Sequence, residues 1–294
     1  VVACGAMTPE LLDTEIAATK ALTDKPFGVN LITMHPALDQ LIGICLEHEV
    51  GHIILAGGLP GGPAIARAKE GAAKVVCFAP TLALAKRLIR QGADALVIEG
   101  AEAGGHIGPV ATSVLAQEIL PHIHDVPVFI AGGIARGDAV VGYLEMGASG
   151  CQLGTRFVCA EESIAHENFK RAFIRASARD AMPSLQLDSE FPVIPVRALQ
   201  NHATRDFQET QRKVIDSFRR GELDQTEAQL KIEHYWAGAL RRAVVDGDIE
   251  TGSLMAGQSV GLVKSVQPTT EILRELVDQA LAALEGRGQA KAIN

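Results

Sequence analysis

The sequence predicts an α/β protein built on a TIM (β/α)₈ barrel. Short apolar runs alternate with amphipathic stretches of helical period, which is typical of right-handed βαβ units. The runs recur about every 20–25 residues, the period of such a barrel. Glycine-rich loops follow several of the runs rather than one. A doubly wound sheet, which gathers its ligand loops at a single switch point, fits this pattern less closely.

Six runs are expected to be strands, because near-continuous apolar segments are typical of parallel strands buried on both faces. They are Phe27–Leu31, Ile53–Ala56, Val75–Ala79, Ala95–Glu99, Val128–Ala131 and Cys151–Gly154. A closed barrel needs eight strands, and an open sheet would expose two edges. The first residues, Val1–Ala6, resemble the tail of a further strand. We therefore expect the barrel to lack its N-terminal strands here, by a βαβ-sized piece of about 30 residues.

The pattern changes after about Glu161. Segments 164–181 and 203–245 have helical character, the second with a break at Gly221, and a last amphipathic helix covers Thr270–Glu285. We expect a barrel made of residues 1–163 and 266–294, with residues 164–265 forming a helical lid.

Composition limits the partners. The formal net charge of −8 disfavours nucleic acid, and an acidic carrier protein would need a local basic patch. No apolar run is long enough to cross a membrane. Five scattered cysteines indicate reduced thiols in the cytoplasm, without metal-site spacing. These bounds favour a cytoplasmic protein with a small-molecule substrate and no metal, and they allow for a homodimer.

The segment Val97–Gly108 combines an apolar strand with a loop of small residues around His106. The small residues Ala103, Gly104 and Gly105 would let a flat ligand lie against bare backbone. A loop histidine titrates near neutrality and can act as an acid or base. A purely structural loop histidine is the alternative.

Two further loops predict phosphate binding. Gly132-Gly133 ends one strand and Gly154-Thr155 the next, so backbone N–H groups there would face an anion. The loops after the last two strands of many (β/α)₈ enzymes hold a phosphate. The alternative is that these glycines only make tight turns.

Polar residues at strand ends add candidate ligand contacts. The amide of Asn30 can donate and accept at the edge of a heterocycle, or it can cap a turn, and Gln152 has the same alternatives. A lone carboxylate such as Glu99 is costly at the end of a buried strand unless it is paired. It could bond a cofactor hydroxyl or hold a neighbouring loop.

The lid contributes a second group of candidates. Arg197, Asn201 and Arg205 have the spacing of one helical face. They could contact substrate or a pyridine nucleotide phosphate, or form a solvated ion-pair face. Ser253 and Gln258 could approach the ligand, although close helix packing would need the same small residues around them.

With Glu102-Ala103-Gly104-Gly105-His106 and Gln152-Leu153-Gly154-Thr155-Arg156-Phe157, the chain resembles the nitronate monooxygenase (2-nitropropane dioxygenase-like) family. That family includes flavin-dependent enoyl-acyl-carrier-protein reductase II. Similarity extends over further segments, Pro26–Asn30, Ala131–Ile134, Arg197–Phe207 and Gly247–Val263. The resemblance implies a barrel that holds FMN at its strand ends beneath a helical subdomain. The family's first strand and its Gly-Gly-Met loop, which also touch FMN, have no counterpart here.

Carried over by position, the resemblance assigns His106 as the catalytic histidine. It also implies flavin contacts at Asn30 and Gln152 and a phosphate cradle at Gly132, Gly133, Gly154 and Thr155. The leading expectation is oxidation of alkyl nitronates with O₂. The alternative is an NADH- or NADPH-dependent enoyl-acyl-carrier-protein reductase II or a related flavin reductase. A third hypothesis is a flavin-free phosphate-binding barrel.

Overall fold

The computed structural model describes residues 1–5, 7–193, 195–236 and 238–292, which form two compact units. Unit 1 comprises Val1–Glu99, Ser113–Ile130 and Met146–Gly150. Unit 2 comprises Gly100–Thr112, Ala131–Glu145 and Cys151–Asn294. The boundaries expected for the barrel and lid stay a prediction.

A curled seven-stranded sheet, with strands in the order β1-β2-β3-β4-β5-β7-β8, confirms the α/β class. The strands are β1 (Val2–Ala3), β2 (Gly28–Ile32), β3 (His52–Ala56), β4 (Lys74–Phe78), β5 (Ala95–Glu99), β7 (Val128–Ala131) and β8 (Gly150–Gln152). All six expected strands are present. The seventh, β1, is the predicted strand tail at the start of the chain, and it pairs in parallel with β2.

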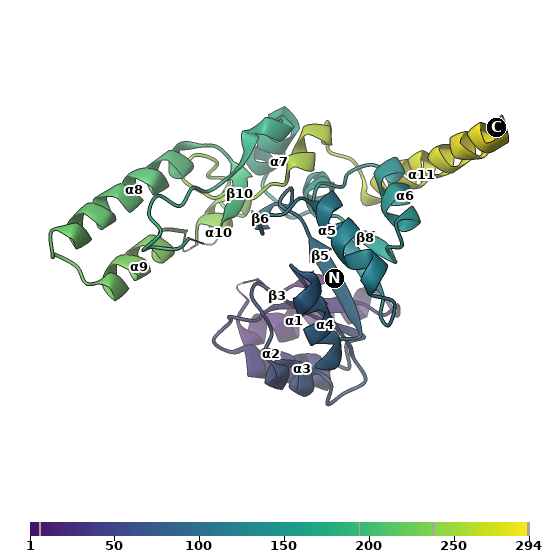
Figure 1. Cartoon of the computed structure of the whole chain (residues 1–294), viewed down its shortest axis with the longest axis horizontal. Helices are drawn as coiled ribbons and strands as arrows, with labels where there is room; N and C mark the ends of the chain where they lie inside the picture. Colours follow the sequence, from purple (N-terminus) through teal and green to yellow (C-terminus); the bar gives the residue numbers. More distant parts are fainter. Residues whose placement is uncertain (6, 194, 237, 293–294) are drawn as a thin grey trace. The chain divides into compact units, whose positions relative to one another are not determined.

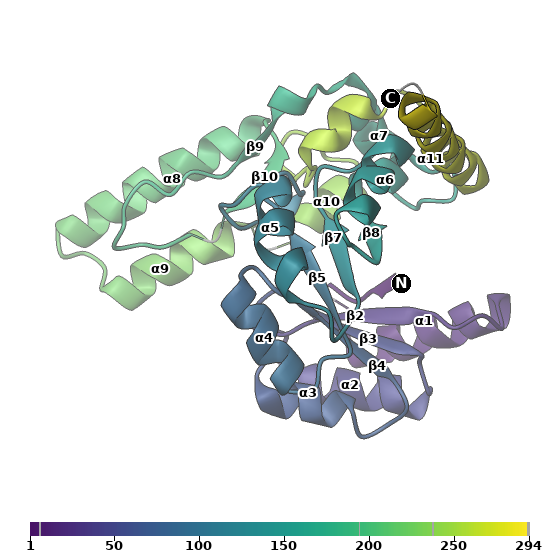
Figure 2. The ribbon, with the colours of Figure 1, turned by 45° about the vertical axis from the view of Figure 1, so that its right-hand side comes forward.

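Unit 1 contains the strands β1 to β5 with helices beside them (Figure 2). The helices are α1 (Pro9–Leu22), α2 (Leu38–Glu47), α3 (Gly62–Ala68), α4 (Leu82–Arg90) and most of α5 (Thr112–Ile119). Consecutive strand residues such as Ile53, Ile54 and Leu55 are all buried, as expected for a parallel sheet covered on both faces. The side chain of Thr81 accepts a hydrogen bond from Leu84 N at 3.3 Å and so begins α4.

In unit 2, helix α6 (Gly137–Glu145) packs against the last helix, α11 (Thr269–Ala292), as Figure 1 shows. The contact needs a glycine, because a Cβ on Gly137 would lie 1.9 Å from the carbonyl oxygen of Leu276. Gln279 Oε1 accepts a hydrogen bond from Gly137 N at 2.9 Å. Within the described ranges, no helix has an apolar stretch long enough to cross a bilayer.

Unit 2 also contains a small antiparallel sheet in the order β6-β10-β9. Its strands are β6 (Gly105–His106), β9 (Ala181–Pro183) and β10 (Val196–Leu199). The predicted helical segments are present as α7 (Glu167–Arg175), α8 (His202–Arg219), α9 (Gln225–Glu233) and α10 (Ala239–Val244). Helices α8 and α9 lie side by side in Figures 1 and 2. The predicted break at Gly221 is confirmed: its φ of +75° is in the left-handed region.

Candidate functional site

The loop after β7 has the conformation of a glycine-specific turn. Gly132 and Gly133 have φ of +96° and +73°, values that L side chains rarely adopt. A Cβ on Gly132 would also lie 3.1 Å from Thr112 Oγ1, and one on Gly133 would lie 3.1 Å from Glu102 Cβ. The backbone conformation therefore favours glycine, and a Cβ at either position would also press on a neighbouring side chain.

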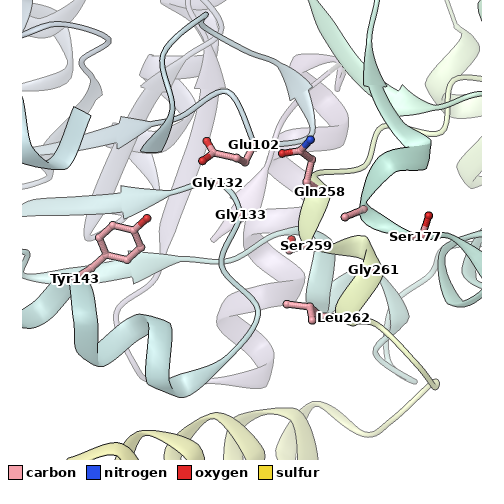
Figure 3. A pocket seen from close by; sticks show the side chains of 10 residues that line it. Glu102, Gly132, Gly133, Tyr143, Ser177, Gln258, Ser259, Gly261 and Leu262 are labelled. Carbon is pink, nitrogen blue, oxygen red and sulfur yellow. The ribbon is translucent and has the colours of Figure 1, made fainter. Parts of the chain in front are cut away.

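This loop borders a cavity of about 450 Å³, which we call the glycine-loop pocket (Figure 3). Its volume is in the range of pockets that bind small molecules and cofactors. All the residues that line it belong to unit 2. They are Glu102, Gly132, Gly133, Tyr143, Ser177, Ala178, Gln258, Ser259, Gly261 and Leu262. The predicted phosphate glycines and the predicted ligand contact Gln258 therefore share one pocket.

Glu102 joins the loops of this pocket. Its Oε2 accepts hydrogen bonds from Thr112 N at 2.9 Å and Thr112 Oγ1 at 2.8 Å. Its main-chain oxygen accepts one from Gln258 N at 2.9 Å. The residue fixes the start of α5, the loop after β5 and the segment around Gln258 relative to one another.

The second predicted phosphate loop lies outside the glycine-loop pocket. Gln152 is the last residue of β8 and is exposed, and Gly154 precedes the short helix η2 (Thr155–Cys159). Thr155 Oγ1 accepts a hydrogen bond from Gly257 N at 3.0 Å. The predicted hydroxyl ligand thus holds the segment that supplies Gln258, and its contact with phosphate stays a prediction.

His106 is held by strand pairing. Its strand β6 pairs antiparallel with β10, with His106 opposite Val196, and Ile107 N donates to Pro195 O at 3.0 Å. The imidazole is exposed, yet surrounding protein removes part of its hydration, which lowers the pKa of His106 from its usual 6.5. A neutral imidazole at neutral pH suits an acid–base role.

The loop before His106 packs tightly on the segment that ends at Gln258. A Cβ on Gly104 would lie 2.5 Å from Gly257 N, and Ala103 is buried. Gly105 has φ +81°, which only glycine adopts without strain. Backbone packing against protein therefore explains Ala103 and Gly104 directly, and their contact with a flat ligand stays a prediction.

Asn30 and Glu99 belong to unit 1. Asn30 is the third of five residues in β2, so the prediction that it ends the strand is wrong: the apolar run continues through Leu31 and Ile32. Glu99 is the last residue of β5, as predicted. Burial raises the pKa of Glu99 to about 7, because the ionised carboxylate loses hydration.

The prediction that Arg197, Asn201 and Arg205 share one helical face is wrong. Arg197 lies in β10 and Asn201 is the N-cap of α8, so only Arg205 lies within a helix, where it is exposed. Arg197 is buried, and its guanidinium donates to Ala101 O at 2.8 Å and to Ala181 O at 2.5 Å. Its partners are backbone carbonyls of the loop after β5 and of β9.

The other two lid candidates are also buried. Asn201 Nδ2 donates to the carbonyl oxygens of Ile249 and Gly252, both at 2.8 Å. Ser253 is 2% exposed, and its hydroxyl has no hydrogen-bond partner among the described residues. Asn201 therefore has a capping role, and Ser253 stays available to a ligand.

Several lining residues escaped sequence analysis. They are Glu102, Tyr143, Ser177, Ala178, Ser259, Gly261 and Leu262. Ser259 follows Gln258 directly, so the prediction of Gln258 as a ligand contact could have been extended to Ser259. Tyr143 comes from the middle of α6, and burial together with the charge of Glu102 raises its pKa. Its helical position gave no indication of a pocket.

Comparison with known proteins gives one consistent family. The sequence model of the family described as nitronate monooxygenase matches residues 37–279. A nitronate monooxygenase from Paraburkholderia phytofirmans is 29% identical over 60% of this chain and 60% of its own length. An octahydroindene-4-carboxyl-CoA dehydrogenase from Rhodococcus jostii is 26% identical over 99% of this chain and 88% of its own.

Solved structures agree with this result. FabK from Thermotoga maritima superposes with a TM-score of 0.85 and 36% identity, covering 97% of this chain and 86% of its own. Nitroalkane oxidase from Streptomyces ansochromogenes gives 0.78 at 24% identity, covering 97% of this chain and 88% of its own, and supports the fold. The TIM-barrel class is therefore confirmed.

Proposed function

Because this chain belongs to the nitronate monooxygenase family, whose members are flavoprotein oxidoreductases, we propose that it is an FMN-dependent reductase of α,β-unsaturated acyl thioesters. The observation that carries the flavin assignment is the glycine-loop pocket. Bound FMN would supply hydride chemistry, with NADH or NADPH as the proposed electron donor.

The residues of the pocket fit a phosphorylated, hydroxyl-rich group. Left-handed Gly132 and Gly133 expose main-chain N–H groups that suit a phosphate. Gln258, Ser259 and Tyr143 can donate to phosphate or polyol oxygens. Asn30 and Glu99 of unit 1, Gln152 and Gly154 stay predicted flavin contacts.

His106 is the proposed proton-transfer residue. Because its pKa is lowered, the ring is mostly neutral at physiological pH, so one nitrogen can accept a proton while the other donates. In a reductase, His106 would polarise the thioester carbonyl or deliver the proton to carbon. In a nitronate oxidase, it would hold the proton next to the nitro group.

Two comparisons favour the thioester substrate. FabK, an enoyl-acyl-carrier-protein reductase II, is more similar to this chain than the nitronate monooxygenase named above, and over more of its length. The octahydroindene-4-carboxyl-CoA dehydrogenase is also named for a thioester substrate. Oxidation of alkyl nitronates is the second candidate, supported by the description of the matching family and by the relatives named for that activity.

Anaerobic mixing separates the two candidates. The purified protein should be yellow, and NADH or NADPH should bleach its flavin absorbance without oxygen. Addition of an enoyl thioester should then restore the absorbance. Bleaching by an alkyl nitronate alone would replace the first candidate with the second, and a colourless protein that binds no FMN would reject both.

A further inference from the structure

The imidazole of His106 and one wall of a second cavity share a face of the small sheet. His106 lies opposite Val196 in the antiparallel pair β6–β10, and directly opposed residues project to the same face. Side chains alternate along a strand, so Ala198 projects with Val196. Ala198 in turn lies opposite Met182 of β9. Val196, Ala198 and Met182 all line the second cavity, which we call the β10 cavity.

The β10 cavity is narrow and uncharged. Its space is about 20 Å³, slightly more than one water molecule needs. Apolar side chains, including Phe207, form much of its wall, and no charged residue in the described part of the chain lines it. A phosphate or carboxylate would therefore enter without a counter-charge, which is costly. The dimensions and wall suit one small neutral group, such as the terminal methyl or a single oxygen at the end of a chain.

Two hydrogen-bond donors at this wall lack acceptors. Ser253 Oγ and Trp236 Nε1 are buried, and neither has a hydrogen-bond partner among the described residues. An indole N–H only donates, and a buried donor without an acceptor is unfavourable. The cavity therefore offers two donors to a small neutral acceptor within an apolar slot.

We propose that the β10 cavity receives the distal end of the substrate's acyl chain, and that a keto or hydroxyl oxygen on this end accepts a hydrogen bond from Ser253 or Trp236. The inference rests on the proposed function, because His106 marks where the reactive end lies. Strands in a sheet are about 4.8 Å apart, so β9 lies roughly 10 Å from β6. A medium-length acyl chain spans that distance, whereas a crotonyl group or a small nitronate does not.

The only tryptophan of the chain gives a direct readout, because Trp236 itself lines the cavity. Oxidised holoenzyme is titrated with three N-acetylcysteamine thioesters: crotonyl, octenoyl, and octenoyl with a keto oxygen near the chain end. We expect the keto compound to shift tryptophan emission to the red and to bind about tenfold more tightly than plain octenoyl. Crotonyl should perturb flavin absorbance without changing tryptophan emission.

Two variants and a control test the assignment. Ser253→Ala should remove most of the advantage of the keto compound over plain octenoyl. Ala198→Leu should fill the slot and raise the KM of both octenoyl compounds at least tenfold relative to crotonyl. Ser184→Ala is the matched control: Ser184 also lines the cavity, but its hydroxyl already accepts from Val196 N at 2.9 Å. It should leave the keto advantage in place.

The outcomes separate the two proposals. Turnover of thioesters without any tryptophan response, keto preference or effect of Ala198→Leu would overturn the cavity assignment and keep the reductase. The cavity assignment would also be overturned if crotonyl changed tryptophan emission as strongly as the keto compound does. Such a result would indicate that both compounds only displace water. If no thioester binds or is turned over, both proposals fail.

Discussion

The carboxyl of Glu99 should make the stability of the protein depend on pH in a calculable way. Its pKa rises from 4.5 to about 7 on folding, because burial disfavours the charged form. At 1.36 kcal/mol per pH unit, this difference corresponds to about 3 kcal/mol. A raised pKa stabilises the fold fully below pH 4.5, and that stabilisation is lost as pH rises through about 7. Most of this stabilisation should disappear between pH 5 and pH 8.

Urea unfolding of flavin-free protein, followed by circular dichroism at pH 5 and pH 8, measures this loss. Glu99→Gln keeps the shape but cannot ionise, so its stability relative to wild type should rise by most of that difference, about 3 kcal/mol, across the interval. Glu118→Gln, at an exposed position of α5, should follow wild type. A constant difference between Glu99→Gln and wild type at both pH values would refute the burial argument.

Three further changes have defined outcomes. His106→Ala should lower kcat by about 10²–10⁴ while FMN stays bound. In the wild type, kcat/KM should fall on the acid side only below pH 6.5, because the pKa of His106 is lowered. Unchanged turnover of the variant would remove this residue from the mechanism. Gly133→Ala, at φ +73°, should weaken FMN binding about tenfold in a fluorescence titration; unchanged affinity would show that this turn does not hold the cofactor. Arg197→Met should cost about 3 kcal/mol in urea unfolding, because the carbonyls of Ala101 and Ala181 lose a charged donor; a loss below 1 kcal/mol would show that water replaces it.

Local sequence patterns were sufficient to predict much of the fold. Runs such as Val75–Ala79 predicted β4 because strands buried on both faces leave a continuous apolar signal. Gly221 predicted the end of α8 because only a left-handed residue was needed there. The strands β6, β9 and β10 could not be predicted in the same way. They contain two to four residues each and are defined by pairing between distant segments, such as His106 with Val196.

The same division applies to the site. Glycines 132 and 133 could be predicted because a strand followed by two glycines is a local signal. The helical reading of Arg197 failed because a spacing of four residues does not show that β10 turns into α8 at Asn201. Tyr143 could not be found at all, because a side chain in the middle of α6 looks the same whether it faces a pocket or solvent. Its place depends on segments more than thirty residues away.

His106 alone cannot decide between the two candidate reactions. Both place a proton on, or hold one near, a carbon beside an electron-withdrawing group, and a neutral imidazole serves either. The discrimination must come from what surrounds the rest of the substrate. An alkyl nitronate needs little space beyond the reacting carbon, whereas a thioester reductase must accommodate a chain. If the uncharged cavity along β10 receives the end of an acyl chain, as we propose, it contributes to the thioester reaction and not to oxidation of a small nitronate. Dependence of KM on chain length is therefore more informative about the reaction than any substitution at His106.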